Sequence, residues 1–225
     1  GPLSSVKFRW WAIARHQMLR HLTNRWAWVL AVVSGWYYFI MIAIFFVIEQ
    51  MASSDPNMLK QFVGRVNWVD QFLLGFSFSQ LIYFALAINF GASTIANDNR
   101  ANALLVYLGK PCTKFDYVLG KWLGVFLPLF GLQLLMTTIF WLYGVASFGD
   151  YGFIKRALWM ELRMIPVHAM SASLLASIAI GISSLFQNGR LAVASMAASY
   201  FILNFFSQFI VLAISEQLHN NGFRL

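Results

Sequence analysis

The sequence predicts an all-α integral membrane protein, in which a bundle of five transmembrane helices follows an amphipathic interfacial helix. Five long segments contain no Asp, Glu, Lys or Arg: residues 26–48, 71–97, 122–149, 164–188 and 191–215. A helix needs ~20 mostly apolar residues to cross ~30 Å of hydrocarbon, and each segment is longer. None shows the alternating pattern of a barrel strand. The composition agrees, because only 11% of the residues are charged, against roughly 25% in soluble domains.

The residues before the first span are predicted to form a cytoplasmic interfacial helix, residues 3–25. Residues 1–2, Gly-Pro, resemble the remnant of a cleaved expression tag and are left out of the fold prediction. On a helical wheel one stripe is apolar: Phe8, Trp11, Ala12, Ala14, Met18, Leu19 and Leu22. Arg9 and Arg20 lie opposite this stripe, which is typical of a helix lying in the plane of the membrane interface.

The charges orient the transmembrane domain, residues 26–215. The N-terminus and the loops after the second and fourth spans carry ten basic and two acidic residues, a net charge of +8. The other two loops and the C-terminal segment, residues 216–225, carry six of each. The Lys/Arg bias predicts that the first side is cytoplasmic, in a plasma (inner) membrane with the N-terminus inside. The basic charge thus reports topology, and we expect no nucleic-acid partner.

The loops on the outer side are short, and each is predicted to carry a surface helix, near residues 59–66 and 154–162. Pro166 is expected to mark the bend into the fourth span. Within the spans, small residues at four-residue spacing are expected to let helix backbones approach closely. The third span opens with such a pair, Gly120 and Gly124.

The most informative loop is the cytoplasmic one between the second and third spans, residues 97–121. Asn97–Asn99 are predicted to start a helix, with Asp98 near the positive end of its dipole. Residues 101–108 are predicted to form a short helix with three leucines on one side, Leu104, Leu105 and Leu108. A further helix is expected to begin near Thr113 and to continue into the third span.

This loop resembles the cytoplasmic loop of ABC transporter permeases of the type-two exporter class. An acidic and a basic residue, a leucine-rich helix, a proline and an aliphatic-Gly-Lys motif carry the resemblance: Asp98, Arg100, Leu104, Leu105, Pro111, Lys114 and Leu119-Gly120-Lys121. It implies that the short helix is a coupling helix, which docks onto a separate cytosolic ABC ATPase. The ATPase contacts that it implies are Asp98, Arg100, Leu104, Leu105 and Leu108. It also implies a homodimer or pseudo-dimer of permeases in the lipid bilayer.

The chain departs from this family pattern in two places. The family usually has a Glu at the start of the loop, where this chain has Asn97-Asp98. The family also has six spans, and the five found here leave residues 216–225 as an outer segment. We therefore expect that the native protein continues past Leu225 into a sixth apolar helix.

No nucleotide site is expected in this chain. The phosphate-binding loop Gly-x4-Gly-Lys-[Ser/Thr] is missing, since Gly120-Lys121 is followed by Trp122. We therefore expect a transport subunit that is not an enzyme and binds no cofactor itself, with ATP and Mg²⁺ held by the partner ATPase.

Polar residues within the spans leave other functions open. His168 near Ser171 would suit a lipid enzyme, but no Gly-x-Ser-x-Gly motif surrounds the serines, and His168 is expected at the outer interface. No predicted span contains an ionisable Asp, Glu, Lys or Arg, which argues against an ion-coupled carrier. Gln133 and Asn204 are candidates for a substrate path, or alternatively for hydrogen bonds between helices.

The sequence thus predicts the membrane-spanning subunit of an ATP-driven exporter that moves an amphipathic or lipid-linked substrate. The first alternative is a membrane relay or scaffold driven by an ATPase, without transport. The second is a membrane-embedded lipid enzyme.

Overall fold

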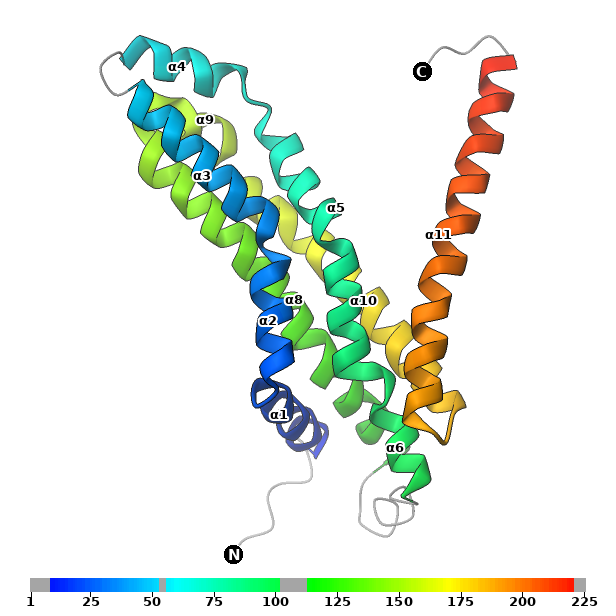
Figure 1. The fold of residues 1–225 in the computed structure, drawn as a ribbon. Helices are drawn as coiled ribbons and strands as arrows, with labels where there is room; N and C mark the ends of the chain where they lie inside the picture. The colour runs from blue at the N-terminus through cyan, green and yellow to red at the C-terminus, as the bar shows by residue number, and fades with distance from the viewer. Residues whose placement is uncertain (1–8, 53–55, 102–112, 221–225) are drawn as a thin grey trace, which may run out of the picture.

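The computed structural model describes residues 9–52, 56–101 and 113–220, and within these ranges the chain forms helices joined by short turns (Figure 1). The first elements are α1 (Arg9–Leu22), α2 (Arg25–Ser34), α3 (Trp36–Met51), α4 (Pro56–Arg65), α5 (Trp68–Ala87), the π-helical segment η2 (Ile88–Ala92) and α6 (Thr94–Arg100). They are followed by α8 (Lys114–Phe148), the π-helical segment η3 (Gly149–Phe153), α9 (Ile154–Ala157), α10 (Met160–Leu185) and α11 (Gly189–Asn220).

Four helical stretches of the described residues are long and apolar enough to cross a membrane: Trp68–Arg100, Lys114–Ala157, Met160–Leu185 and Gly189–Ser207. A fifth span results if α2 and α3, which meet at an angle of 46°, cross together. The all-α membrane fold predicted from the sequence is therefore confirmed, with the first span bent at Gly35. The hydroxyl of Ser79 donates to the carbonyl oxygen of Ser34 at 2.6 Å, which satisfies an acceptor at the break.

The long helix α8 begins where the sequence predicted. The hydroxyl of Thr113 accepts from the Asp116 amide at 3.1 Å, and the Asp116 carboxylate accepts from the Thr113 amide at 3.2 Å. This capping box satisfies two donors at the helix start. Helix α1 crosses α8 at Gly120 and Gly124. A Cβ on Gly120 would lie 2.7 Å from the backbone oxygen of Trp10, so the close approach expected of these glycines is confirmed.

An aromatic core fills the end of the bundle farthest from α1. Trp68 of α5 and Phe153 of η3 meet edge to face with ring centroids 4.6 Å apart, and Phe72 and Phe140 do so at 5.2 Å. The surface helix expected near residues 59–66 is present as α4. The bend expected at Pro166 is wrong, because α10 already begins at Met160 and contains that proline within its first turns.

Helix α11 diverges from the other helices along its length (Figure 1). Near Gly189 it is close to α6, where a Cβ on that glycine would lie 2.5 Å from the Asn97 side-chain oxygen. Farther along, large apolar side chains are exposed: Phe201, Phe205, Phe206 and Phe209. An apolar surface of this kind suits contact with lipid or with another membrane helix.

Candidate functional site

The short helix α6 lies at the same end of the molecule as α1, next to the lower ends of α10 and α11 (Figure 1). The expectation that Asn97–Asn99 start a helix is wrong. The second span continues through η2 into α6, so these residues form its last turn, which ends at Arg100. Asp98 therefore lies near the negative end of the helix dipole, where an acidic side chain needs a compensating partner.

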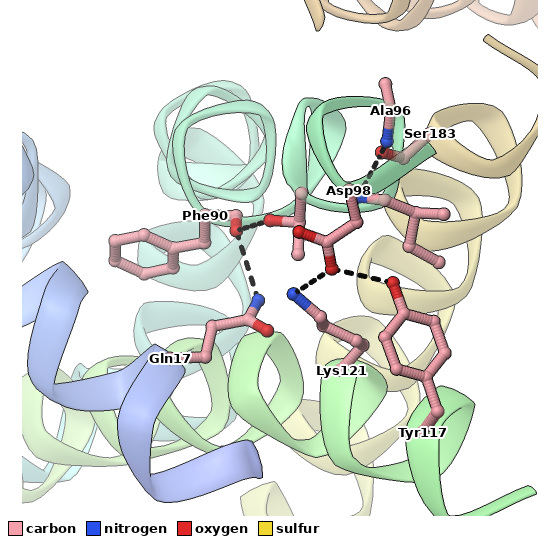
Figure 2. A network of polar contacts seen from close by, with 9 residues as sticks. Gln17, Phe90, Ala96, Asp98, Tyr117, Lys121 and Ser183 are labelled. Carbon is pink, nitrogen blue, oxygen red and sulfur yellow. Dashed lines mark hydrogen bonds and ion pairs between the residues drawn. The ribbon is translucent and has the colours of Figure 1, made fainter. Parts of the chain in front are cut away.

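Lys121 and Tyr117 of α8 supply that compensation (Figure 2). The Lys121 ammonium lies 2.8 Å from the Asp98 carboxylate, and both side chains are mostly buried. The Tyr117 hydroxyl donates to the same carboxylate oxygen at 2.7 Å. Lys121 and Tyr117 are four residues apart and so lie on one face of α8. The ion pair and the hydrogen bond fix α6 to the longest helix of the protein.

Helix α6 is also fixed to α10. The hydroxyl of Ser183 accepts from the amides of Ile95 and Ala96 at 2.9 and 3.1 Å (Figure 2). These amides belong to the first turn of α6, whose donors need outside partners. The Asn99 side chain donates to the carbonyl oxygen of Phe186 at 3.3 Å, which joins the end of α6 to the turn before α11.

A third set of contacts joins α1 to the same region. The side-chain amide of Gln17 donates to the carbonyl oxygen of Phe90 at 3.4 Å, and the Thr94 hydroxyl donates to the same oxygen at 2.9 Å (Figure 2). Phe90 belongs to η2, and a π-helical turn within a span often marks a functional position. The segment formed by η2 and α6 is thus in polar contact with α1, α8 and α10.

Two of the five residues assigned to the ATPase contact lie in this described region. Arg100 is exposed at the end of α6, and it lines an open hollow of about 710 Å³ together with Arg190. Asp98 instead makes its contacts within the chain. Leu104, Leu105 and Leu108 lie outside the described residues, as does most of the predicted coupling helix, residues 101–108.

A second polar cluster lies within the membrane-spanning part. Gln133 of α8 is fully buried, and its side-chain amide donates to the Ser171 hydroxyl of α10 at 3.3 Å. Ser171 in turn donates to the Gln80 side-chain oxygen of α5 at 3.3 Å. Gln133 therefore makes the interhelical hydrogen bond that the sequence offered as its alternative role.

Next to Gln133, the structure corrects one expectation. His168 is fully buried rather than interfacial, and its Nε2 lies 3.1 Å from the Thr137 hydroxyl. Glu161 belongs to the first turn of α10 and accepts from Thr137 and Thr138 at 3.1 and 2.7 Å. The helix thus extends past the charge-free segment to Glu161, which is partly buried in its first turn. No Asp, Glu, Lys or Arg is among the fully buried side chains of the described residues, as the sequence led us to expect.

Four buried side-chain atoms of this interior cluster have no hydrogen-bond partner among the described residues: Gln80 Nε2, Gln133 Oε1, Glu161 Oε2 and His168 Nδ1. Gln80 and Ser171 also line a cavity of about 610 Å³ between α5, α10 and α11. Asn204 of α11 is exposed on the wall of this cavity. Of the two candidate path residues, Asn204 thus lines the cavity itself, and Gln133 contacts the cavity lining through Ser171.

Comparison with protein families decides the class of the protein. The family described as ABC-2 family transporter protein matches residues 11–223. The chain belongs to the ABC-2 family of transporter proteins. Its helices are thus those of an ABC transporter permease, which associates in general with an ABC ATPase. A search of curated proteins found no match.

The sequence analysis did not identify several residues of this ABC-2 permease that the structure brings together. Tyr117 could have been found, because it lies one helical turn before Lys121 on the expected helix. The contacts of Gln17 with Phe90 and of Ser183 with Ile95 carry no local signal, since the partners are at least 73 residues apart in the chain. Contacts of that kind depend on how the helices cross.

Proposed function

We propose that this ABC-2 permease is the membrane-spanning subunit of an ATP-driven exporter of an amphipathic or lipid-linked substrate. Its ATPase, which holds ATP and Mg²⁺, docks on the segment that follows α6. The observation that supports this most directly is the threefold attachment of the segment formed by η2 and α6. The Asp98–Lys121 ion pair joins it to α8, Ser183 joins it to α10, and the carbonyl oxygen of Phe90 joins neighbouring η2 to α1.

In this proposal, ATP binding displaces the segment carrying Leu104, Leu105 and Leu108, and α6 transmits the movement to the spans. Arg100, exposed at the end of α6, contacts the ATPase directly. Asp98 acts through its attachment to Lys121. The permease works as a homodimer or pseudo-dimer in the plasma (inner) membrane, with α1 and the N-terminus on the cytoplasmic side.

The substrate path in this proposal runs along the cavity between α5, α10 and α11. Its wall is mostly apolar and includes Phe76 and Phe84, with Asn204 and the Gln80–Ser171 pair as polar groups. Such a lining suits a molecule with both apolar and hydrogen-bonding parts. Gln133 donates a hydrogen bond to Ser171, which lines the cavity. In this proposal, Gln133 therefore positions Ser171 toward the cavity.

The ATPase contact is tested by the double substitution Leu104→Asp/Leu105→Asp. Buried anchors of small interfaces often contribute ~2 kcal/mol or more each. We expect the variant to lose copurification with the ATPase and to lose stimulated ATP hydrolysis, while it still inserts in the membrane. The control is Met58→Asp, an exposed position on α4 at the other end of the bundle. A double variant that keeps both the complex and its ATP hydrolysis would refute the coupling role.

Transport in proteoliposomes distinguishes the exporter from the alternative of a membrane relay. The exporter should accumulate a fluorescent amphipathic substrate against its gradient when ATP is added, whereas a relay should hydrolyse ATP without accumulation. The lipid-enzyme alternative finds less support, because Ser171 is bonded to Gln80 and Gln133, and His168 faces Thr137. The serine and the histidine therefore do not form a nucleophile–base pair.

A further inference from the structure

A polar cavity of about 550 Å³ lies between α1, η2, α6 and α8. Basic and amide side chains line it, among them Arg20, His21, Asn89, Asn97 and Lys121. Among the described residues, no acidic side chain lines it, and Asp98 nearby is already paired with Lys121. Arg20 is exposed on α1. The cavity therefore offers positive charge and hydrogen-bond donors to a ligand, which is the chemistry that binds an anionic group.

Two buried polar atoms at this cavity have no hydrogen-bond partner among the described residues. They are Oε1 of Gln17 and Nε2 of His21, and both side chains line the cavity. Gln17 Oε1 is an acceptor, so a ligand that satisfies it must donate a hydrogen bond. Buried polar groups are normally paired. A ligand that carries hydroxyl groups as well as a negative charge would suit this lining.

An apolar groove of about 290 Å³ lies beside this cavity. His21 and Phe90 line both hollows. The groove runs between α2 and α8, and apolar or small side chains line it, including Ala27, Ala31, Leu132 and Leu135. Gly131 lies on its wall, and a Cβ built there meets no atom within 4 Å. A polar, basic hollow thus lies next to an apolar one that follows two membrane-spanning helices, with the His21 and Phe90 rings, 4.5 Å apart, on the wall of both.

We propose that these two adjacent hollows together bind an anionic phospholipid with a hydroxylated headgroup, of the phosphatidylglycerol type. The phosphate lies at Arg20, and Lys121, whose charge is already paired with Asp98, supplies a further N–H donor to it. The headgroup hydroxyls contact Gln17 and His21. One acyl chain lies in the groove along Gly131. The lipid enters from the leaflet against which α1 lies. The site depends on the membrane location of the chain and on no step of transport, so it can be tested without an ATPase.

The test is lipid binding to the purified, delipidated full chain, measured by native mass spectrometry and by thermal stabilisation in detergent. The probes are phosphatidylglycerol, phosphatidylcholine with the same acyl chains, and glycerol phosphate alone. We expect at least tenfold tighter binding of phosphatidylglycerol than of the other two. Equal binding of both lipids would overturn the charge assignment. Glycerol phosphate binding as tightly as the lipid would show that the ligand is a soluble phosphate.

Two variants separate the two parts of the site, each with a matched control. Arg20→Gln should remove most of the preference for phosphatidylglycerol, whereas Arg15→Gln, also exposed on α1 but outside the cavity lining, should keep it. Gly131→Leu should fill the groove and weaken binding about tenfold. Gly181→Leu is its control, since that glycine of α10 also has open space around it. The proposal is overturned if each variant binds lipid like its control.

Discussion

At the level of single residues, the side chain of Asp98 makes the polar contacts that join α6 to α8. Its carboxylate accepts from Tyr117 and pairs with Lys121, and hydrogen bonds to charged groups contribute roughly 1.5–3 kcal/mol each. The sequence analysis identified Asp98 and Lys121 separately, because each belongs to the resemblance motif. It did not predict their pairing, since that depends on α6 continuing the second span down to the level of Lys121.

The first prediction is that Asp98→Asn and Lys121→Gln are not additive. Each single change leaves a partly buried charge without its partner, so each should lower the free energy of unfolding by about 1–3 kcal/mol. The double variant should lose little more than either single one. Thermal unfolding in detergent measures all three. Asp150→Asn, an exposed change at the other end of α8, should combine additively with Lys121→Gln, and additivity within the Asp98 pair would contradict the ion pair.

The second prediction concerns the pH dependence contributed by His21. Burial, with Arg20 and Lys121 as the nearest charges, lowers the pKa of His21 to about 4. The unfolded chain takes up this proton near pH 6.5 and the folded chain only near pH 4, so stability falls as the pH falls between these values. At pH 5 the loss is about 2 kcal/mol.

The variant His21→Phe tests this dependence and keeps an aromatic ring against Phe90, whose ring centroid lies 4.5 Å from that of His21. Between pH 7.5 and pH 5 its midpoint of thermal unfolding should decrease less than that of the unchanged protein. An equal decrease in both proteins would mean that His21 is not protonated more easily in the unfolded chain.

At the level of helices, the sequence located all the long apolar elements but not all their ends. Segments defined by the absence of charge stop at the first charged residue. This definition excluded Glu161 from α10, although its carboxylate is held by Thr137 and Thr138. The absence of charge also could not show the break at Gly35, because a straight helix and a bent helix can have the same apolar sequence. Helix starts with a capping box, such as Thr113, were predictable because the signal is local.

The third prediction concerns the crossing of α1 over α8. A side chain at Gly120 would collide with the backbone oxygen of Trp10 and with Ile13, so Gly120→Val must push α1 away from α8. Overpacking of this kind typically costs 1–3 kcal/mol. We expect a lower unfolding midpoint and increased protease cleavage near α1. Gly181→Val, where the surrounding space is open, is the matched control and should change neither. Similar midpoints for the two variants would argue against this crossing.

At the level of the whole molecule, the length of α8 lets it cross the membrane, and the charge asymmetry supports the proposed orientation. The 35 residues of α8 span ~52 Å at 1.5 Å per residue, more than the ~30 Å of the hydrocarbon layer. Its two ends therefore lie on opposite sides of the membrane. The side of Thr113, α6 and α1 carries the excess of Lys and Arg, which the positive-inside rule assigns to the cytoplasm.

The fourth prediction tests this orientation with an impermeant thiol reagent on intact cells. Asp150→Cys, at an exposed position just after α8, should react from outside. Asn97→Cys, exposed on α6, and the native Cys112 should react only after the membrane is permeabilised. The native cysteine is replaced by serine when the two new positions are tested, so that each signal has one source.

Labelling of Asn97→Cys in intact cells would reverse the topology, and it would place the proposed ATPase contact on the wrong side of the membrane. The same result would also move the lipid site to the opposite leaflet, because His21 and Asn97 line one cavity.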